Sequence, residues 1–148
     1  MLVNVSLGLA LAGALATPIL AYAGYSSVAL DLHQMYLFLC PQRPSHSYFL
    51  LGHQLALEER EIAMFTAQLV GGLVYGKLRA RLRIEVNSIV FVALSLPLAW
   101  DVLSQTLAVR SSDWFTRSWT GAIFMVAFAF WFYPRLERER PGAHSSVA

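Results

Sequence analysis

The chain has 148 residues, of which 57% are hydrophobic and 14% are charged, and its formal net charge is +2. A soluble domain usually carries about a quarter charged residues, so the composition favours one small integral membrane domain. The low net charge gives no reason to expect a nucleic-acid partner. The single cysteine excludes an internal disulfide and the multi-cysteine zinc patterns. We therefore expect membrane lipids around the chain and no bound cofactor.

Stretches of about 20 mostly apolar residues predict membrane-spanning helices. Four such segments follow one another along the chain, at residues 2–22, 61–77, 86–103 and 118–134. The first has no charge and lacks the basic start of a signal peptide, so we expect a permanent helix. The predicted fold is an all-α four-helix membrane bundle, with residues 1–148 as a single domain.

Two prolines and one long connection add detail to this bundle. Pro97 predicts a kink in the third span, and Pro134 predicts the end of the fourth, because proline lacks the backbone N–H that a helix needs. The connection over residues 23–60 contains the stretch 28–39, which is typical of an interfacial or re-entrant helix.

The distribution of Lys and Arg predicts the orientation, because these residues concentrate on the cytoplasmic side. The basic residues on one side of the four spans are Lys77, Arg79, Arg81, Arg83, Arg135, Arg138 and Arg140. Those on the other side are fewer: Arg43, Arg60, Arg110 and Arg117. We therefore place both termini and the tail 135–148 in the cytoplasm, and the connection 23–60 outside the inner (plasma) membrane.

The connection 23–60 also contains the cysteine and several histidines. Cys40, His46 and His53 are candidate ligands for a metal or redox centre, with His33 as a fourth. Their spacing matches no compact ligand pattern, so the sequence favours loop residues packed at the membrane surface and predicts no metal. A catalytic Cys–His pair would also need an oxyanion hole and an orienting third group, and no motif indicates either.

Charged residues mark the start of the second span. Glu58, Glu59 and Glu61 stand where carboxylates complement the positive end of a helix dipole. Arg60 lies among them and is expected to extend to the interface or to pair with a carboxylate. We interpret this run as an N-terminal charge cap of the helix.

The third span contains a carboxylate, and intramembrane ionisable residues are functional candidates. Asp101 and Gln105 lie at i and i+4, so they share one helix face. Arg60, Arg110 and Arg117 are the candidate cations for Asp101. The favoured interpretation is a structural polar clamp that these residues form with Gln105, and the alternative is a proton or ligand site.

Small residues at a spacing of four allow helix backbones to approach each other in lipid. One such stripe contains Gly72 and Gly76, and another contains Gly8, Ala12 and Ala16. Packing within the bundle is the favoured interpretation, and packing against a partner subunit is the alternative.

Several of these residues also follow the order of a known pattern. They are Cys40, Gln42, Pro44, Ser47, Tyr48, Gly52, Gln54, Arg60, Pro97, Asp101, Gln105, Arg110, Ser112, Arg117, Thr120 and Gly121. In this the chain resembles a family of small bacterial and archaeal predicted membrane proteins of unknown function, whose pattern runs C-H-Q-x-P-x-R-S-F, then C-x-R-C, P-x-x-x-D-x-x-x-Q and R-x-x-T-G. The resemblance implies the fold, and it implies no activity.

The departures from that pattern concern its Cys/His set. The family's histidine after the first cysteine is Pro41 here, its arginine before the serine is His46, and its later cysteines correspond to Glu58 and Glu61. The resemblance therefore implies that the Cys40 stretch is the remnant of a site that relatives retain.

These observations lead to one hypothesis and two alternatives. The hypothesis is a non-catalytic accessory subunit in a hetero-oligomeric complex with other integral membrane subunits, such as a quinol-oxidising or photosynthetic electron-transfer assembly. The first alternative is a small transporter or channel that uses Asp101 and Gln105. The second is a metal-handling or redox membrane protein that uses Cys40, His46 and His53.

Overall fold

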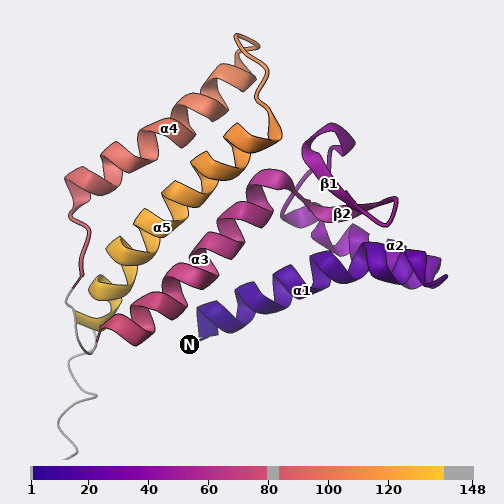
Figure 1. The fold of residues 1–148 in the computed structure, drawn as a ribbon, viewed down its shortest axis with the longest axis horizontal. Coiled ribbons are helices and arrows are strands. Elements are labelled where there is room, and N and C mark those ends of the chain that lie inside the picture. The colour runs from indigo at the N-terminus through magenta and orange to yellow at the C-terminus, as the bar shows by residue number, and fades with distance from the viewer. Residues whose placement is uncertain (1, 80–83, 139–148) are drawn as a thin grey trace, which may run out of the picture.

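The computed structural model describes residues 2–79 and 84–138. Its helices are α1 (Leu2–Tyr22), α2 (Ser26–Met35), α3 (Glu59–Leu78), α4 (Ser88–Thr106) and α5 (Trp114–Arg138), with 3-10 turns at Tyr36–Phe38 and Pro44–His46. The strands are β1 (Ser47–Leu50) and β2 (His53–Glu58). Helices α3, α5 and α4 lie side by side with α5 in the middle, and α1 packs against α3, α2 and β2 (Figure 1). Residues 80–83 and the tail residues 139–148, on which part of the predicted orientation depends, lie outside the described residues.

The two strands correct the all-α prediction. They pair antiparallel, with Leu50 opposite His53, and the two residues between them have positive φ, 54° at Leu51 and 81° at Gly52. Positive φ at both central residues is the geometry of the tight turn that joins hairpin strands. Glycine adopts this geometry without strain, but leucine does not, so the dipeptide Leu51–Gly52 is a weak turn signal and the hairpin was missed.

Helix α1 has the predicted bounds and contains a proline. Pro18 cannot donate to the carbonyl of Ala14, one turn earlier. The hydroxyl of Thr17 donates to that carbonyl instead, at 2.8 Å. Because the freed backbone group is satisfied locally, the helix continues to Tyr22.

Helix α5 corrects the prediction that Pro134 ends the fourth span. The helix continues to Arg138 with Pro134 inside it and buried. Pro134 has no backbone N–H to donate to the carbonyl of Phe130. That carbonyl instead accepts a hydrogen bond from the backbone N–H of Val86 at 3.1 Å. The guanidinium of Arg135 donates in turn to the Val86 carbonyl at 3.3 Å. The segment before α4 therefore supplies the hydrogen bond that the proline removes.

Two of the described helices, α1 and α4, are long and apolar enough to cross a membrane, judged by length and composition. Helices α3 and α5 fall where the other two spans are predicted, but charged residues lie near their ends. The chain is thus mostly helical with two candidate spans, and the four-span bundle stays a prediction.

The small-residue stripes pack differently from one another. A Cβ at Gly72 would lie 2.9 Å from the Tyr133 hydroxyl and still closer to Asn4, so α1, α3 and α5 meet there. Gly8 and Gly76 have no neighbour within 4 Å, and Ala12 is exposed while Ala16 is half-buried. The buried face of α1 is instead formed by Ala14, Thr17 and Pro18.

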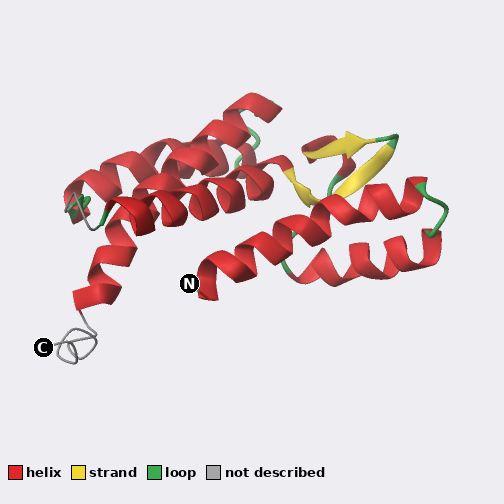
Figure 2. Ribbon diagram, turned by 60° about the horizontal axis from the view of Figure 1, so that its bottom comes forward, coloured by secondary structure: helices red, strands yellow, loops and turns green. Residues whose placement is uncertain are grey.

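The segment before α3 forms a compact unit around the C-terminal half of α1. Helix α2 folds back along α1, and the hairpin lies across both (Figure 2). The Tyr36 hydroxyl donates to the Ala10 carbonyl of α1 at 2.6 Å. The Gln42 amide donates to the carbonyls of His33 and Ala56, at 2.7 Å and 3.0 Å. The helix predicted over residues 28–39 is therefore present as α2 and the following 3-10 turn, while its position relative to a membrane stays a prediction.

Candidate functional site

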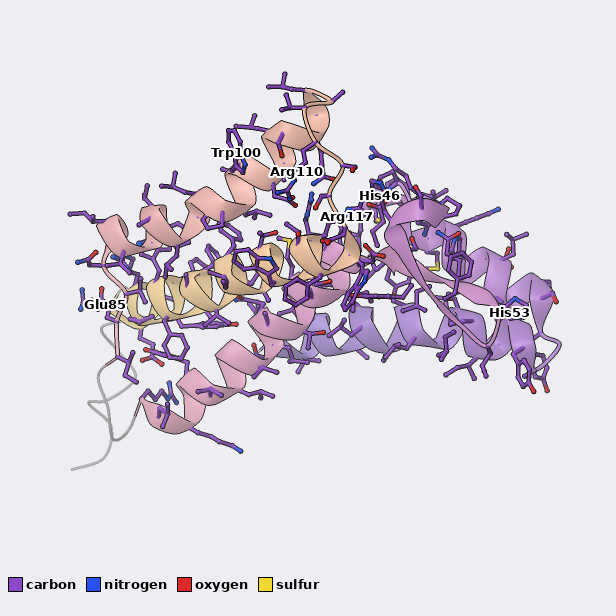
Figure 3. The ribbon with its side chains drawn as sticks, turned by 45° about the horizontal axis from the view of Figure 1, so that its top comes forward. His46, His53, Glu85, Trp100, Arg110 and Arg117 are labelled. Atoms are coloured by element: carbon purple, nitrogen blue, oxygen red, sulfur yellow. The ribbon has the colours of Figure 1, made fainter. Side chains whose placement is uncertain are left out.

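Polar side chains collect at one end of the bundle, where the hairpin leads into α3, α4 ends and α5 begins (Figure 3). At its centre is Asp101 of α4, which is 1% exposed. Arg60 of α3 donates to Asp101 Oδ2 at 2.7 Å, Gln105 donates to the same oxygen at 3.0 Å, and Arg110 donates to Oδ1 at 3.3 Å. A buried carboxylate is tolerated when paired and hydrogen-bonded in this way.

A second buried ion pair lies beside the first. Arg117, in the first turn of α5, donates to Glu59 Oε2 at 3.1 Å, and the two side chains are 10% and 9% exposed. The same guanidinium approaches the Ser45 carbonyl at 3.5 Å. Arg117 therefore pairs with Glu59 rather than with Asp101, and it connects α5 to both α3 and the loop before the hairpin.

A third group contains the cysteine. Cys40 Sγ lies 3.8 Å from Glu61 Oε2, and ligand atoms of Cys40, Glu58 and Glu61 all lie within 4.8 Å of one another. Glu58 Oε1 accepts the backbone N–H of Arg43 at 2.9 Å, and Glu58 Oε2 lies 3.8 Å from His46 Nδ1. We call Cys40, Glu58 and Glu61 the thiol–carboxylate cluster.

The ligand set suggested by the sequence is only partly assembled. His53, at the start of β2, is exposed, and it is not among the described residues whose ligand atoms lie close to Cys40. His33 contributes its backbone carbonyl to the Gln42 amide, and burial lowers the pKa of its imidazole. His46 is the histidine that adjoins the cluster.

Burial also sets the protonation of the groups near the cluster. It raises the pKa of the Cys40 thiol to about 11, and the Glu61 and Glu58 carboxylates contribute in the same direction. Burial lowers the pKa of His46, as does the Arg117 guanidinium, while the Glu58 carboxylate opposes this shift. At neutral pH, without another cation, these shifts favour a neutral Cys40 thiol and a neutral His46 imidazole.

The model of a protein family described as "Predicted membrane protein (DUF2085)" matches residues 40–131, which is more than half of the chain. The chain belongs to this family. The uncharacterized protein MJ1492 of Methanocaldococcus jannaschii is 29% identical to it over 122 residues, covering 78% of this chain and 77% of that protein. No solved structure matches the chain.

The family match confirms the resemblance to membrane proteins of unknown function. The matched segment runs from Cys40 into α5, so it contains both ion pairs and the thiol–carboxylate cluster. The residue pattern quoted for the family stays a prediction.

These groups surround a pocket at the polar end, with a volume of about 520 Å³. Its lining includes Arg43, His46, Glu58, Arg60, Glu61 and Arg110. The sequence identified these residues one group at a time, but it did not predict that they lie around one pocket. The available signal was the i and i+3 spacing of Glu58 and Glu61, which places both carboxylates on one side of a helix start.

Proposed function

We propose that the protein is a non-catalytic accessory subunit of a larger membrane complex. The observation that carries this proposal is that the Asp101 carboxylate is used in hydrogen bonds within the fold. It accepts from three donors, which belong to α3, α4 and the loop after α4. A carboxylate used in this way connects segments of the fold and has little exposure to a substrate. The Arg117–Glu59 pair has the same character.

The outward faces of the helices support the association with other subunits. Gly8 and Gly76 face open space, and Ala12 is exposed, so parts of both small-residue stripes are free of contacts within the described chain. Small residues on a lipid-facing surface let a second helix approach closely. The partner that we propose is another integral membrane subunit, and an electron-transfer complex is the class we would examine first.

Purification in a mild detergent followed by native mass spectrometry tests this proposal. We expect a stable assembly in which the chain, of 16.5 kDa, is one component among larger membrane subunits. Replacing Gly8 with Leu on the outward face should release the chain from the assembly without unfolding it. Isolation as a single species with no co-purifying subunit would contradict the proposal.

A transport role for Asp101 and Gln105 makes a different prediction. Gln105 lines the pocket, but Asp101 is 1% exposed, so a path along both would require the clamp to open. Ion or solute flux into liposomes that contain the protein, compared with the Asp101→Asn variant, distinguishes the two roles. The accessory role predicts no flux in either sample.

A further inference from the structure

Two carboxylates of the polar end lack the cationic partner that the others have. Arg60 and Arg110 contact Asp101, and Arg117 contacts Glu59. Within the described residues, neither Glu58 nor Glu61 has an Arg or Lys side chain at ion-pair distance, and the nearest basic group is His46, at 3.8 Å from Glu58. The Glu58 and Glu61 carboxylates therefore lie near each other without a direct ion pair to a guanidinium or ammonium group of the described residues.

Glu58 also presents an oxygen with no hydrogen-bond donor in the described part of the chain. The residue is 8% exposed, and its Oε1 accepts the Arg43 N–H. Its Oε2 lies 3.8 Å from His46 Nδ1. Glu58 lines the pocket, so this oxygen is available to a positively charged ligand that enters from there.

The geometry suits a metal ion as that ligand. Two atoms that bind one ion at about 2.0–2.3 Å each lie no more than about 4.6 Å apart. Cys40 Sγ and Glu61 Oε2 already satisfy this limit at 3.8 Å, and all three ligand atoms lie within 4.8 Å. A small side-chain rotation would complete the set. A thiolate combined with carboxylates suits a transition metal better than Mg²⁺ or Ca²⁺, which prefer oxygen alone.

The pocket gives the metal a route to the cluster. Glu58, Glu61 and His46 line it, so an ion can enter from that side, and a water molecule can occupy a fourth position. Cys40 is 2% exposed and is not among the lining residues. His46 Nδ1 lies 3.8 Å from Glu58 Oε2, beyond hydrogen-bond distance, so it leaves that oxygen free for the metal.

We propose that Cys40, Glu58 and Glu61 bind one divalent transition-metal ion, of the class of Zn²⁺. Binding forms a metal–sulfur bond as the thiol loses its proton to solvent, and the two carboxylates become the remaining protein ligands. This inference goes beyond the accessory role. It holds whether the chain is isolated alone or inside a complex.

The test uses the full chain in detergent after treatment with a chelator, with Co²⁺ and Zn²⁺ as the probes. Co²⁺ bound to a thiolate produces a charge-transfer absorption that carboxylate-bound Co²⁺ lacks. We expect this band to appear with one equivalent of Co²⁺, to be displaced by Zn²⁺, and to be absent in Cys40→Ser. Zn²⁺ should also raise the melting temperature of the wild-type protein, because a ligand of the folded state stabilises it.

Single variants separate this site from the set suggested by the sequence. Glu58→Gln and Glu61→Gln should each weaken Zn²⁺ binding by at least about tenfold. The matched controls are His53→Ala, which alters an exposed hairpin residue, and Glu137→Gln near the C-terminal end of α5, and neither should change the affinity. Size-exclusion chromatography confirms that each variant remains folded before the titration.

Two results would overturn the inference. One is a folded, chelator-treated wild-type protein that shows neither the Co²⁺–thiolate band nor a rise in melting temperature with Zn²⁺. The other is a band that remains unchanged in both Glu58→Gln and Glu61→Gln, which would show that the thiol alone binds Co²⁺.

Discussion

The guanidinium of Arg60 donates to Asp101 at 2.7 Å and so connects α3 to α4, although α5 lies between these helices along the bundle (Figure 1). The contact occurs where α3 begins and α4 ends, close to the start of α5. One carboxylate therefore fixes the relative positions of helices that otherwise pack mainly through α5.

Asp101→Ala should destabilise the fold strongly. The substitution leaves the half-buried guanidinium of Arg60 without its anion, and breaking a buried ion pair costs about 3–5 kcal/mol. Gln105→Ala is the matched control on the same helix face, because it removes hydrogen bonds worth about 1.5–3 kcal/mol and leaves the ion pair in place. Thermal unfolding in detergent measures both, and equal melting temperatures for Asp101→Ala and the wild type would refute a structural role for the clamp.

Gly72 and Gly76 make a matched pair on α3. Gly72→Ala places a methyl group against Asn4 and the Tyr133 hydroxyl, and overpacking of this kind costs about 1–3 kcal/mol. Gly76→Ala meets nothing within 4 Å and should be neutral or stabilising by up to about 1 kcal/mol, since alanine favours the helix. Comparing the unfolding of the two variants tests the packing, and identical effects would show that α1 and α5 do not approach Gly72.

The sequence predicted the helices better than the site, and the reason is physical. An uncharged run such as residues 2–22 admits one structure in lipid, so α1 has the predicted bounds. The prediction that Pro134 ends the helix was wrong because the Phe130 carbonyl, which the proline leaves without a donor, accepts a hydrogen bond from Val86. Val86 lies far from Pro134 in the sequence. A local rule about proline cannot include such a partner.

The candidate site shows the same division. Asp101 and Gln105 were recognised because helical periodicity places them together. The meeting of Cys40 with Glu58 and Glu61 depends on the hairpin that returns the chain to the start of α3. That hairpin turns at Leu51 and Gly52, where the sequence lacks a strong turn signal. The sequence therefore predicted Cys40 as a loop residue and the glutamates as a helix cap, with no contact between them.

His46 should titrate below its ordinary pKa of 6.5 in chelator-treated protein, because burial and the Arg117 guanidinium disfavour its charged form. Its contribution to stability is therefore present above the unfolded-state pKa and is lost as the pH falls through the lower folded-state pKa. Glu58→Gln removes the carboxylate that opposes this shift, so the pKa should fall further.

Histidine NMR of isotope-labelled protein measures this titration, and His46→Gln assigns the signal. A pKa that rises in Glu58→Gln would contradict the arrangement of these two side chains. The experiment is informative only in the absence of metal, since an ion bound to Glu58 would itself repel the imidazolium.

The proposed orientation predicts which loops an impermeant reagent reaches. Cys40 is 2% exposed, but a Cys40→Ser background removes any contribution from it. In that background Ser111→Cys, in the exposed loop after α4, should react with a membrane-impermeant maleimide in intact cells. Lys77→Cys, at the exposed end of α3, should react only after the cells are opened, because we place it on the cytoplasmic side. Labelling of both positions in intact cells would rule out a single crossing by α4, the helix between them. The reverse pattern would invert the orientation while leaving the bundle intact.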